Sequence, residues 1–232
     1  VNNQIEICAM MRSGQHAIMH WLMGHIDEPI YLHNDILCHY GDKAFADRGK
    51  WRNLAGKKPP LRDFPWYIYN IEDISIENLA EIKKVYERAL YIANKEEIIF
   101  PKKEIKALIL RDPFNLIASR YRFYKRMNSI LKAQNHRPLG QLKPTNGNSK
   151  VSWYSTNTIS RWKEYAREYL GETNFVHNKI VIDYNSWFLS KNYRMEISKK
   201  FGFNFTDKNL NFIPHNGGGS SFDLRALDGK AQ

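Results

Sequence analysis

The chain contains little cysteine and no long apolar segment. Only Cys8 and Cys38 occur among its 232 residues, too few for a disulfide framework and not spaced as metal ligands. A run of about 18 apolar residues, which a membrane-spanning helix needs, does not occur. The first residues lead into an apolar segment without the basic-then-apolar pattern of a secretory signal. We therefore expect two reduced thiols, no membrane partner and a cytoplasmic location.

Acidic residues are outnumbered by basic ones, while apolar residues are plentiful. The chain has 35 Lys and Arg against 24 Asp and Glu, a formal net charge of +11, which indicates an anionic partner. That charge defines the sign of the partner but not its identity. Apolar residues make up 43% and aromatic residues 13% of the chain, too much for a disordered protein. With no internal repeat, the length predicts a single domain over residues 1–232.

Apolar runs alternate along the chain with segments of helical spacing. Strands are expected over residues 6–11, 29–35, 64–71, 106–110 and 178–184, and helices over 17–26, 76–94, 113–126, 153–170 and 186–201. Two loop-rich excursions interrupt this order, at about 38–65 and 132–152. Alternating strands and helices predict a three-layer α/β fold with a mostly parallel sheet flanked by helices.

Local signals predict where several helices begin and end. Asp73 or Ser75 is expected to cap the helix over 76–94, and Asp112 the helix that begins at Pro113. Gly171 is expected to end the helix over 153–170. The basic run over 120–126 is expected to form a solvated helix face.

The first strand is followed by a turn at Arg12-Ser13-Gly14 and then by a helix. Such a unit presents backbone N–H groups to an anion, and the helix dipole strengthens their attraction. Arg12 adds a charged, planar donor and Ser13 a hydroxyl. The stretch therefore predicts a loop that binds phosphate or sulfate.

A second strand-to-helix junction contains Arg111-Asp112-Pro113 and, further along the helix, Ser119. An Arg at the strand tip and a Ser two turns into the helix can both reach one phosphate. Ligands in parallel α/β folds bind beyond the carboxyl ends of the strands. We therefore expect the residues that end the strands to gather along one edge; they are Arg12, His33, Glu72, Arg111 and Asp183.

Together, the two junctions resemble the sulfotransferases that use 3′-phosphoadenosine 5′-phosphosulfate (PAPS) as donor. The resemblance implies a P-loop NTPase-like sulfotransferase architecture. It assigns the 5′-phosphosulfate to the first loop, the 3′-phosphate to Arg111 and Ser119, and a closing role to a Gly-rich segment near the C-terminus. The implied nucleotide-binding residues are Arg12, Ser13, Gly14, Gln15, His16, Ala17, Arg111, Ser119, Gly217, Gly218, Gly219 and Ser220.

The chain departs from the family pattern at two places. Gln15 and His16 stand where the family usually has hydroxyl residues, and His215 and Asn216 stand where a basic pair is common. Arg12, by contrast, matches the family's basic loop residue, and Ser13, Gly14, Arg111, Pro113 and Ser119 match directly.

The resemblance implies in-line attack by an acceptor hydroxyl or amine on the sulfur, with release of adenosine 3′,5′-bisphosphate and no metal. Arg12 and the loop N–H groups would stabilise charge on the leaving phosphate. The base would be His33 or Glu72, and the pKa of an unperturbed histidine favours His33 slightly. We expect a small-molecule or glycan acceptor, with a microbial natural product or metabolite as the working hypothesis.

Two other functions are weighed against this one. A P-loop nucleotide or metabolite kinase would share the fold, but the loop lacks the Gly-Lys-Ser/Thr ending that holds a triphosphate and Mg²⁺. A basic, non-enzymatic nucleic-acid-binding protein would suit the net charge, but no zinc finger or RNP signature occurs. We therefore expect no nucleic-acid partner.

Overall fold

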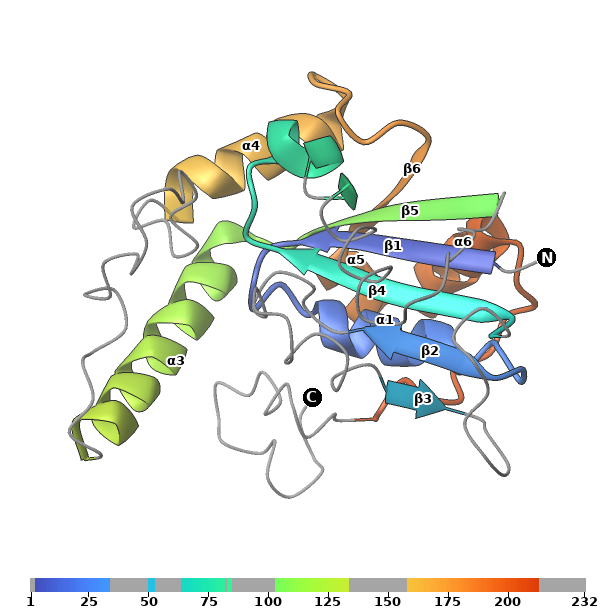
Figure 1. The fold of residues 1–232 in the computed structure, drawn as a ribbon, viewed down its shortest axis with the longest axis horizontal. Helices are drawn as coiled ribbons and strands as arrows, with labels where there is room; N and C mark the ends of the chain where they lie inside the picture. The colour runs from blue at the N-terminus through green and yellow to red at the C-terminus, as the bar shows by residue number, and fades with distance from the viewer. Residues whose placement is uncertain are drawn as a thin grey trace.

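The protein is built on one six-stranded sheet. A computed structural model describes residues 3–33, 50–52, 64–81, 83–84, 103–133 and 158–212. The strand order is β3-β2-β4-β1-β5-β6, in which five neighbouring strands are parallel and β3 runs antiparallel to β2 at one edge (Figure 1). The strands are β1 (Asn3–Ala9), β2 (Ile30–His33), β3 (Lys50–Arg52), β4 (Trp66–Glu72), β5 (Lys103–Leu110) and β6 (Lys179–Asp183).

Helices cover both faces of the sheet, as the alternating sequence predicted. The described helices are α1 (Gln15–Met23), η2 (Ile76–Asn78), α3 (Pro113–Ala133), α4 (Thr158–Leu170), α5 (Tyr184–Leu189) and α6 (Lys191–Phe201). One core cluster joins the sheet to α1, α5 and α6, and a second joins the other face to η2, α4 and the start of α3. Sheet and flanking helices therefore form the three layers of an α/β fold.

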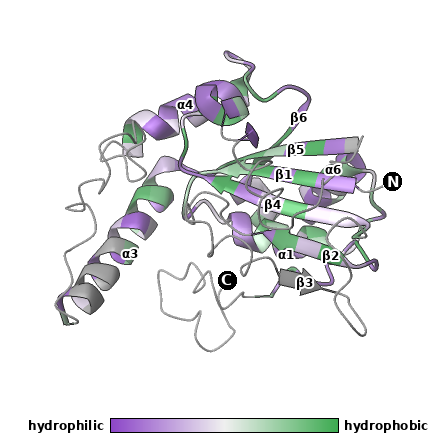
Figure 2. Cartoon of the chain, in the orientation of Figure 1, coloured by the Kyte–Doolittle hydropathy of each residue, from purple (hydrophilic) through white to green (hydrophobic). Residues whose placement is uncertain are grey.

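Side chains of the central strand β1 are buried on both faces of the sheet. Ile5 and Ile7 face the α1 cluster, whereas Cys8 faces the α4 cluster, in keeping with the two-residue period of a strand. Trp21 of α1 and Trp187 of α5 fill the first cluster, with ring centroids 5.8 Å apart. Apolar residues are accordingly concentrated in the strands, while the helices present polar residues outward (Figure 2).

Several helix boundaries match the expectations from the sequence. Asp112 caps α3, its Oδ1 accepting a hydrogen bond of 2.8 Å from the Asn115 N–H. Gly171 follows α4 with a φ of 79°, the left-handed conformation typical of a residue that ends a helix. Both signals were local, so a short stretch of sequence was enough to predict them.

Other expectations are corrected. The excursion over 38–65 was expected to lack regular structure, but residues 50–52 add strand β3 to the sheet. The single helix expected over 186–201 is two helices, because Ser190 is extended and its side chain accepts from the Tyr193 N–H to begin α6. Residues 132 and 133, expected in the second excursion, end α3; the rest of that excursion and residues 153–157 lie outside the described residues.

The caps expected for the helix over 76–94 are also corrected. Ser75 stands before η2, but its side chain makes no capping hydrogen bond there and donates instead to Glu164 of α4. Asp73 does not cap this helix either; its side chain accepts a hydrogen bond from the loop after β1, as described below.

Within the described part of the chain, no helix combines the length and apolar character needed to cross a membrane.

Candidate functional site

The carboxyl ends of the parallel strands form the edge that carries the site. Ala9, the last residue of β1, lies level with Glu72 of β4, and Leu110 of β5 lies level with Asp183 of β6. The ends of β1, β4, β5 and β6 therefore meet along one edge, where α3 also begins (Figure 1), whereas β2 ends short of it.

The loop after β1 is a tight turn that requires glycine. The Ser13 N–H donates to the Met10 carbonyl at 3.0 Å, and Arg12 and Gly14 have φ values of 71° and 89°. A Cβ on Gly14 would lie 2.0 Å from a ring carbon of Tyr184. The close approach of Tyr184 and the positive φ both exclude a larger residue at position 14.

The N-terminus of α1 is suited to an anion. Gly14 supplies no capping side chain and the first turn contains no acidic residue, so no charge within the helix itself offsets the positive end of its dipole. Ser13 Oγ donates to Gln15 Oε1 at 2.9 Å. Gln15 is 1% exposed, yet its Nε2 has no hydrogen-bond partner among the described residues. A buried unpaired donor costs free energy that a ligand oxygen would recover.

The junction after β5 supplies a second buried donor. Arg111 is 6% exposed; its Nη1 donates to the Arg12 carbonyl at 3.1 Å, and its guanidinium lies 4.8 Å from the centre of the Tyr184 ring. Its Nε has no hydrogen-bond partner within the part of the chain that the structure describes. The pKa of neighbouring Asp112 is raised by burial, but hydrogen bonds from Asn115 and Asn185 outweigh that effect and lower it.

The structure brings the two predicted anion-binding motifs together. Arg12 Nε donates to Ser119 Oγ at 3.1 Å across 107 positions of sequence, and Arg111 contacts the same loop across 99. Ser119 is buried on the side of α3 that faces the loop. The loop after β1 and the start of α3 therefore form one basic, largely buried site.

Two residues that hold this loop were missed by the sequence analysis. Asp73 accepts from the Met11 N–H at 3.1 Å, and Arg120 Nε donates to the Met11 carbonyl at 3.1 Å. The two side chains also form an ion pair with each other. Asp73 was expected to cap a helix and Arg120 to face solvent, but Arg120 is 5% exposed. Together they hold both backbone polar groups of Met11, its N–H and its carbonyl.

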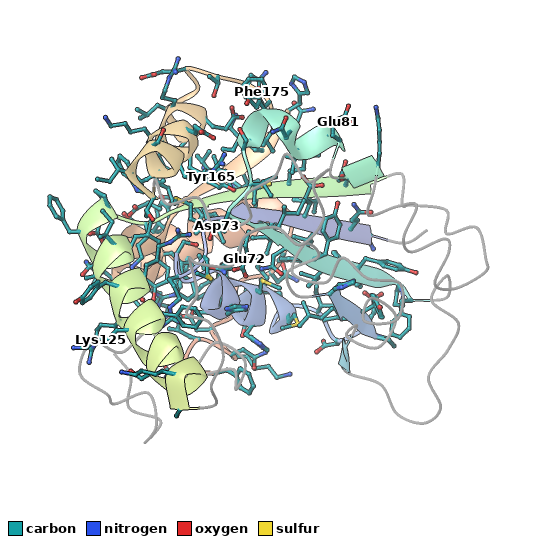
Figure 3. All side chains as sticks on the ribbon, turned by 60° about the vertical axis from the view of Figure 1, so that its left-hand side comes forward. Glu72, Asp73, Glu81, Lys125, Tyr165 and Phe175 are labelled. Atoms are coloured by element: carbon teal, nitrogen blue, oxygen red, sulfur yellow. The ribbon has the colours of Figure 1, made fainter. Side chains whose placement is uncertain are left out.

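Tyr184 was also missed, although its position offered a signal. It directly follows β6 at the carboxyl edge, where ligand-binding residues of such folds gather. Asp73 directly follows β4 at the same edge, and Figure 3 shows it beside Glu72 where that strand ends. Ligands in parallel α/β folds bind beyond the carboxyl ends of the strands, so the residue after each strand is as good a candidate as the last residue of the strand.

The two candidate bases lie at different depths. Glu72 lies level with the end of β1, and its Oε1 is 3.8 Å from Nε2 of His16 and accepts from Asn70 at 2.8 Å. His33 pairs with Tyr69, three residues before Glu72, which is roughly 10 Å further from the edge at about 3.3 Å per residue. His33 is also fully buried. The register therefore favours Glu72 as the group next to the loop.

The remaining predicted site residues divide into two sets. Ala17 lies in the first turn of α1, where its N–H donates to the Gly14 carbonyl at 3.0 Å. The expected closing segment lies outside the described residues; it comprises Gly217, Gly218, Gly219 and Ser220.

Among the described residues, no group of three or more His, Cys, Asp or Glu side chains is arranged to hold a metal ion. No protein-family model matches the chain, and no curated protein or solved structure is significantly similar to it.

Proposed function

We propose that the protein is a sulfotransferase that moves a sulfuryl group from PAPS to a hydroxyl or amine of a small-molecule or glycan acceptor. The observation that carries the proposal is the convergence of Arg12, Arg111 and Ser119 on one buried site. A generic anion loop needs only the first of these. A second cationic donor and a hydroxyl beside it suit a ligand with a second phosphate, as a 3′-phosphorylated nucleotide has.

The unpaired donors of the site support such a ligand. Arg111 Nε and Gln15 Nε2 are buried polar atoms without partners in the described structure. Burying such donors destabilises the protein by about 1–3 kcal/mol each unless an acceptor is supplied. Phosphate oxygens are acceptors of the right charge, so the residues present fit the two ends of a nucleoside bisphosphate.

In the proposed reaction the chain contributes positioning and charge. The oxygen or nitrogen of the acceptor forms a bond to sulfur as the bond from sulfur to the 5′-phosphate oxygen breaks, and adenosine 3′,5′-bisphosphate leaves. Arg12 and the N-terminus of α1 stabilise the charge that develops on the leaving phosphate. Glu72 takes the acceptor's proton, with His33 as the alternative base.

Titration calorimetry with adenosine 3′,5′-bisphosphate, adenosine 5′-monophosphate and ATP tests the proposal. We expect wild type to bind adenosine 3′,5′-bisphosphate with micromolar affinity, at least about tenfold more tightly than adenosine 5′-monophosphate, because charged hydrogen bonds to a 3′-phosphate stabilise by about 1.5–3 kcal/mol. Ser119→Ala should weaken binding of the bisphosphate and leave the monophosphate unchanged. The variant Arg111→Ala should lose most of the affinity, whereas Arg167→Ala, an exposed arginine on α4, serves as the control.

Absence of bisphosphate binding by wild type would overturn the proposal, and Mg²⁺-dependent ATP binding in its place would indicate a kinase. Salt-sensitive binding of nucleic acid without nucleotide affinity would indicate a nucleic-acid-binding protein.

Given bisphosphate binding, the base is identified by comparing wild type with variants of Glu72 and His33 in the turnover of PAPS with phenol, alcohol and amine acceptors. We expect Glu72→Gln to lower kcat at least about a hundredfold with little change in nucleotide affinity, and His33→Ala to lower it less.

A further inference from the structure

Helix α3 carries an exposed apolar stripe. Phe114 is 84% exposed, Ile117 37% and Tyr121 67%. Their spacing of three and then four residues puts them on one side of the helix. Single exposed apolar residues are ordinary, but three aligned on one helix, two of them aromatic, form a surface that water solvates poorly.

The same side of α3 continues as a basic surface. Lys125 and Lys132 lie four and eleven residues after Tyr121, spacings that keep them on the side of the stripe, and both are exposed. Arg122 is exposed next to Tyr121. Figure 3 shows Lys125 directed away from the sheet. The helix contains five basic residues and no acidic one, so nothing in its own sequence neutralises this surface.

This surface is separate from the candidate anion site. Among the side chains of α3 that the structure describes, those of Leu116, Ser119 and Arg120 are buried and face the sheet and the loop after β1. The stripe lies on the opposite side of the helix, and α3 extends outward from the sheet (Figure 1). A partner could therefore contact the stripe without entering the site.

We propose that this side of α3 docks the protein on a membrane surface that contains anionic lipid. Aromatic and aliphatic side chains on one face of a helix, with Lys and Arg beside them, are the combination that inserts shallowly at a lipid headgroup boundary. The long lysine side chains reach back to the headgroups while the apolar ones enter the acyl region. Each basic residue near an anionic leaflet adds to the attraction.

Charge complementarity and the apolar stripe together select lipid over other acidic partners. A nucleic acid or a sulfated polymer would satisfy Arg122, Lys125 and Lys132 but offers no acyl interior for Ile117. A spanning helix is not required for docking of this kind, so the proposal replaces the expectation of no membrane partner, which rested on the lack of a long apolar run and of a secretory signal.

Vesicle sedimentation with the full chain tests the proposal. We expect binding to phosphatidylcholine vesicles that contain about 30% phosphatidylserine, little binding to phosphatidylcholine alone, and weaker binding as NaCl is raised. Phe114→Ser with Tyr121→Ser should weaken binding at least about tenfold. The control, Phe175→Ser with Leu170→Ser, removes two apolar side chains exposed elsewhere and should bind as wild type does.

A second pair of variants separates local from total charge. Lys125→Glu with Lys132→Glu should weaken vesicle binding at least about tenfold, whereas Lys199→Glu with Lys200→Glu, two exposed lysines of α6, changes the net charge equally and should weaken it less than about threefold. Equal losses from the two pairs would overturn the proposal. It would also be overturned if wild type did not bind at low salt, or if the serine pair on α3 bound as tightly as wild type. None of these variants changes a residue of the nucleotide site, so nucleotide binding can fail or succeed independently.

Discussion

At the scale of single residues, the site depends on a close contact between Gly14 and Tyr184. The tyrosine ring lies against the glycine, and the Arg111 guanidinium lies 4.8 Å from the centre of the same ring. The loop conformation and the position of the second cationic donor are therefore coupled through one side chain. A change at position 14 should affect both.

We expect Gly14→Ala to destabilise the protein by about 2–4 kcal/mol and to weaken nucleotide binding, because the added Cβ meets the Tyr184 ring at 2.0 Å and the residue holds a φ of 89°. Gly171→Ala is the matched control: its φ is 79°, but nothing lies within 4 Å of the added atom. That variant should lose only about 1 kcal/mol. Urea denaturation measures both, and equal losses would show that the Tyr184 contact is unimportant.

At the scale of elements, Glu168 joins the end of α4 to the start of β6. It is fully buried and accepts hydrogen bonds from the Thr173 hydroxyl, the N–H groups of Phe175 and Val176, and Lys179 Nζ. Burial raises the pKa of Glu168, but the interaction with Lys179 and the other hydrogen bonds outweigh burial and lower it below the usual 4.5.

This lowered pKa predicts a loss of stability in acid. A carboxyl group with a lower pKa in the folded state stabilises the protein fully above about pH 4.5, and that contribution disappears as the pH falls through the folded value. We expect Glu168→Gln to be less stable than wild type at pH 7 and the difference to shrink below about pH 4.5. Thermal unfolding across pH 3–7 would measure it; a difference that stayed constant with pH would contradict the assignment.

Elements whose signals are local were predictable, and those that depend on distant contacts were not. The run 106–110 and the cap at Asp112 are read from a few neighbouring residues, and both occur. The three-residue strand β3 owes its conformation to its partner β2, so no periodicity marks it. The break at Ser190 lies within continuous helical spacing and depends on a side-chain cap that competes with the helix.

The same distinction applies to the candidate site. Arg12, Arg111 and Ser119 stand at strand-to-helix junctions, which sequence patterns mark. The roles of Asp73 and Arg120 follow from a contact with Met11 that spans 62 and 109 positions, which no local pattern encodes. The preference for Glu72 over His33 likewise follows from strand register, which the sequence did not specify.

At the scale of the whole molecule, Asp73 and Arg120 link β4, the loop after β1 and α3. Their ion pair is largely buried, so removing one partner leaves the other charge uncompensated. We expect Arg120→Met to destabilise the protein by about 3 kcal/mol and Asp73→Asn by a similar amount. The double variant should lose clearly less than the sum, since no unpaired charge remains. Denaturant unfolding of all four proteins checks this, and simple additivity would show that the pair is not coupled.

The central position of β1 has a consequence for how the chain folds as it is synthesised. The strand is translated before both of its neighbours, β4 and β5, which come from residues beyond 65. The Met11 carbonyl of the following loop is held by Arg120, which emerges later still. Until β5 and α3 have been translated, neither the sheet around β1 nor the loop after it can be complete, and the apolar side chains of β1 lack the neighbours that bury them.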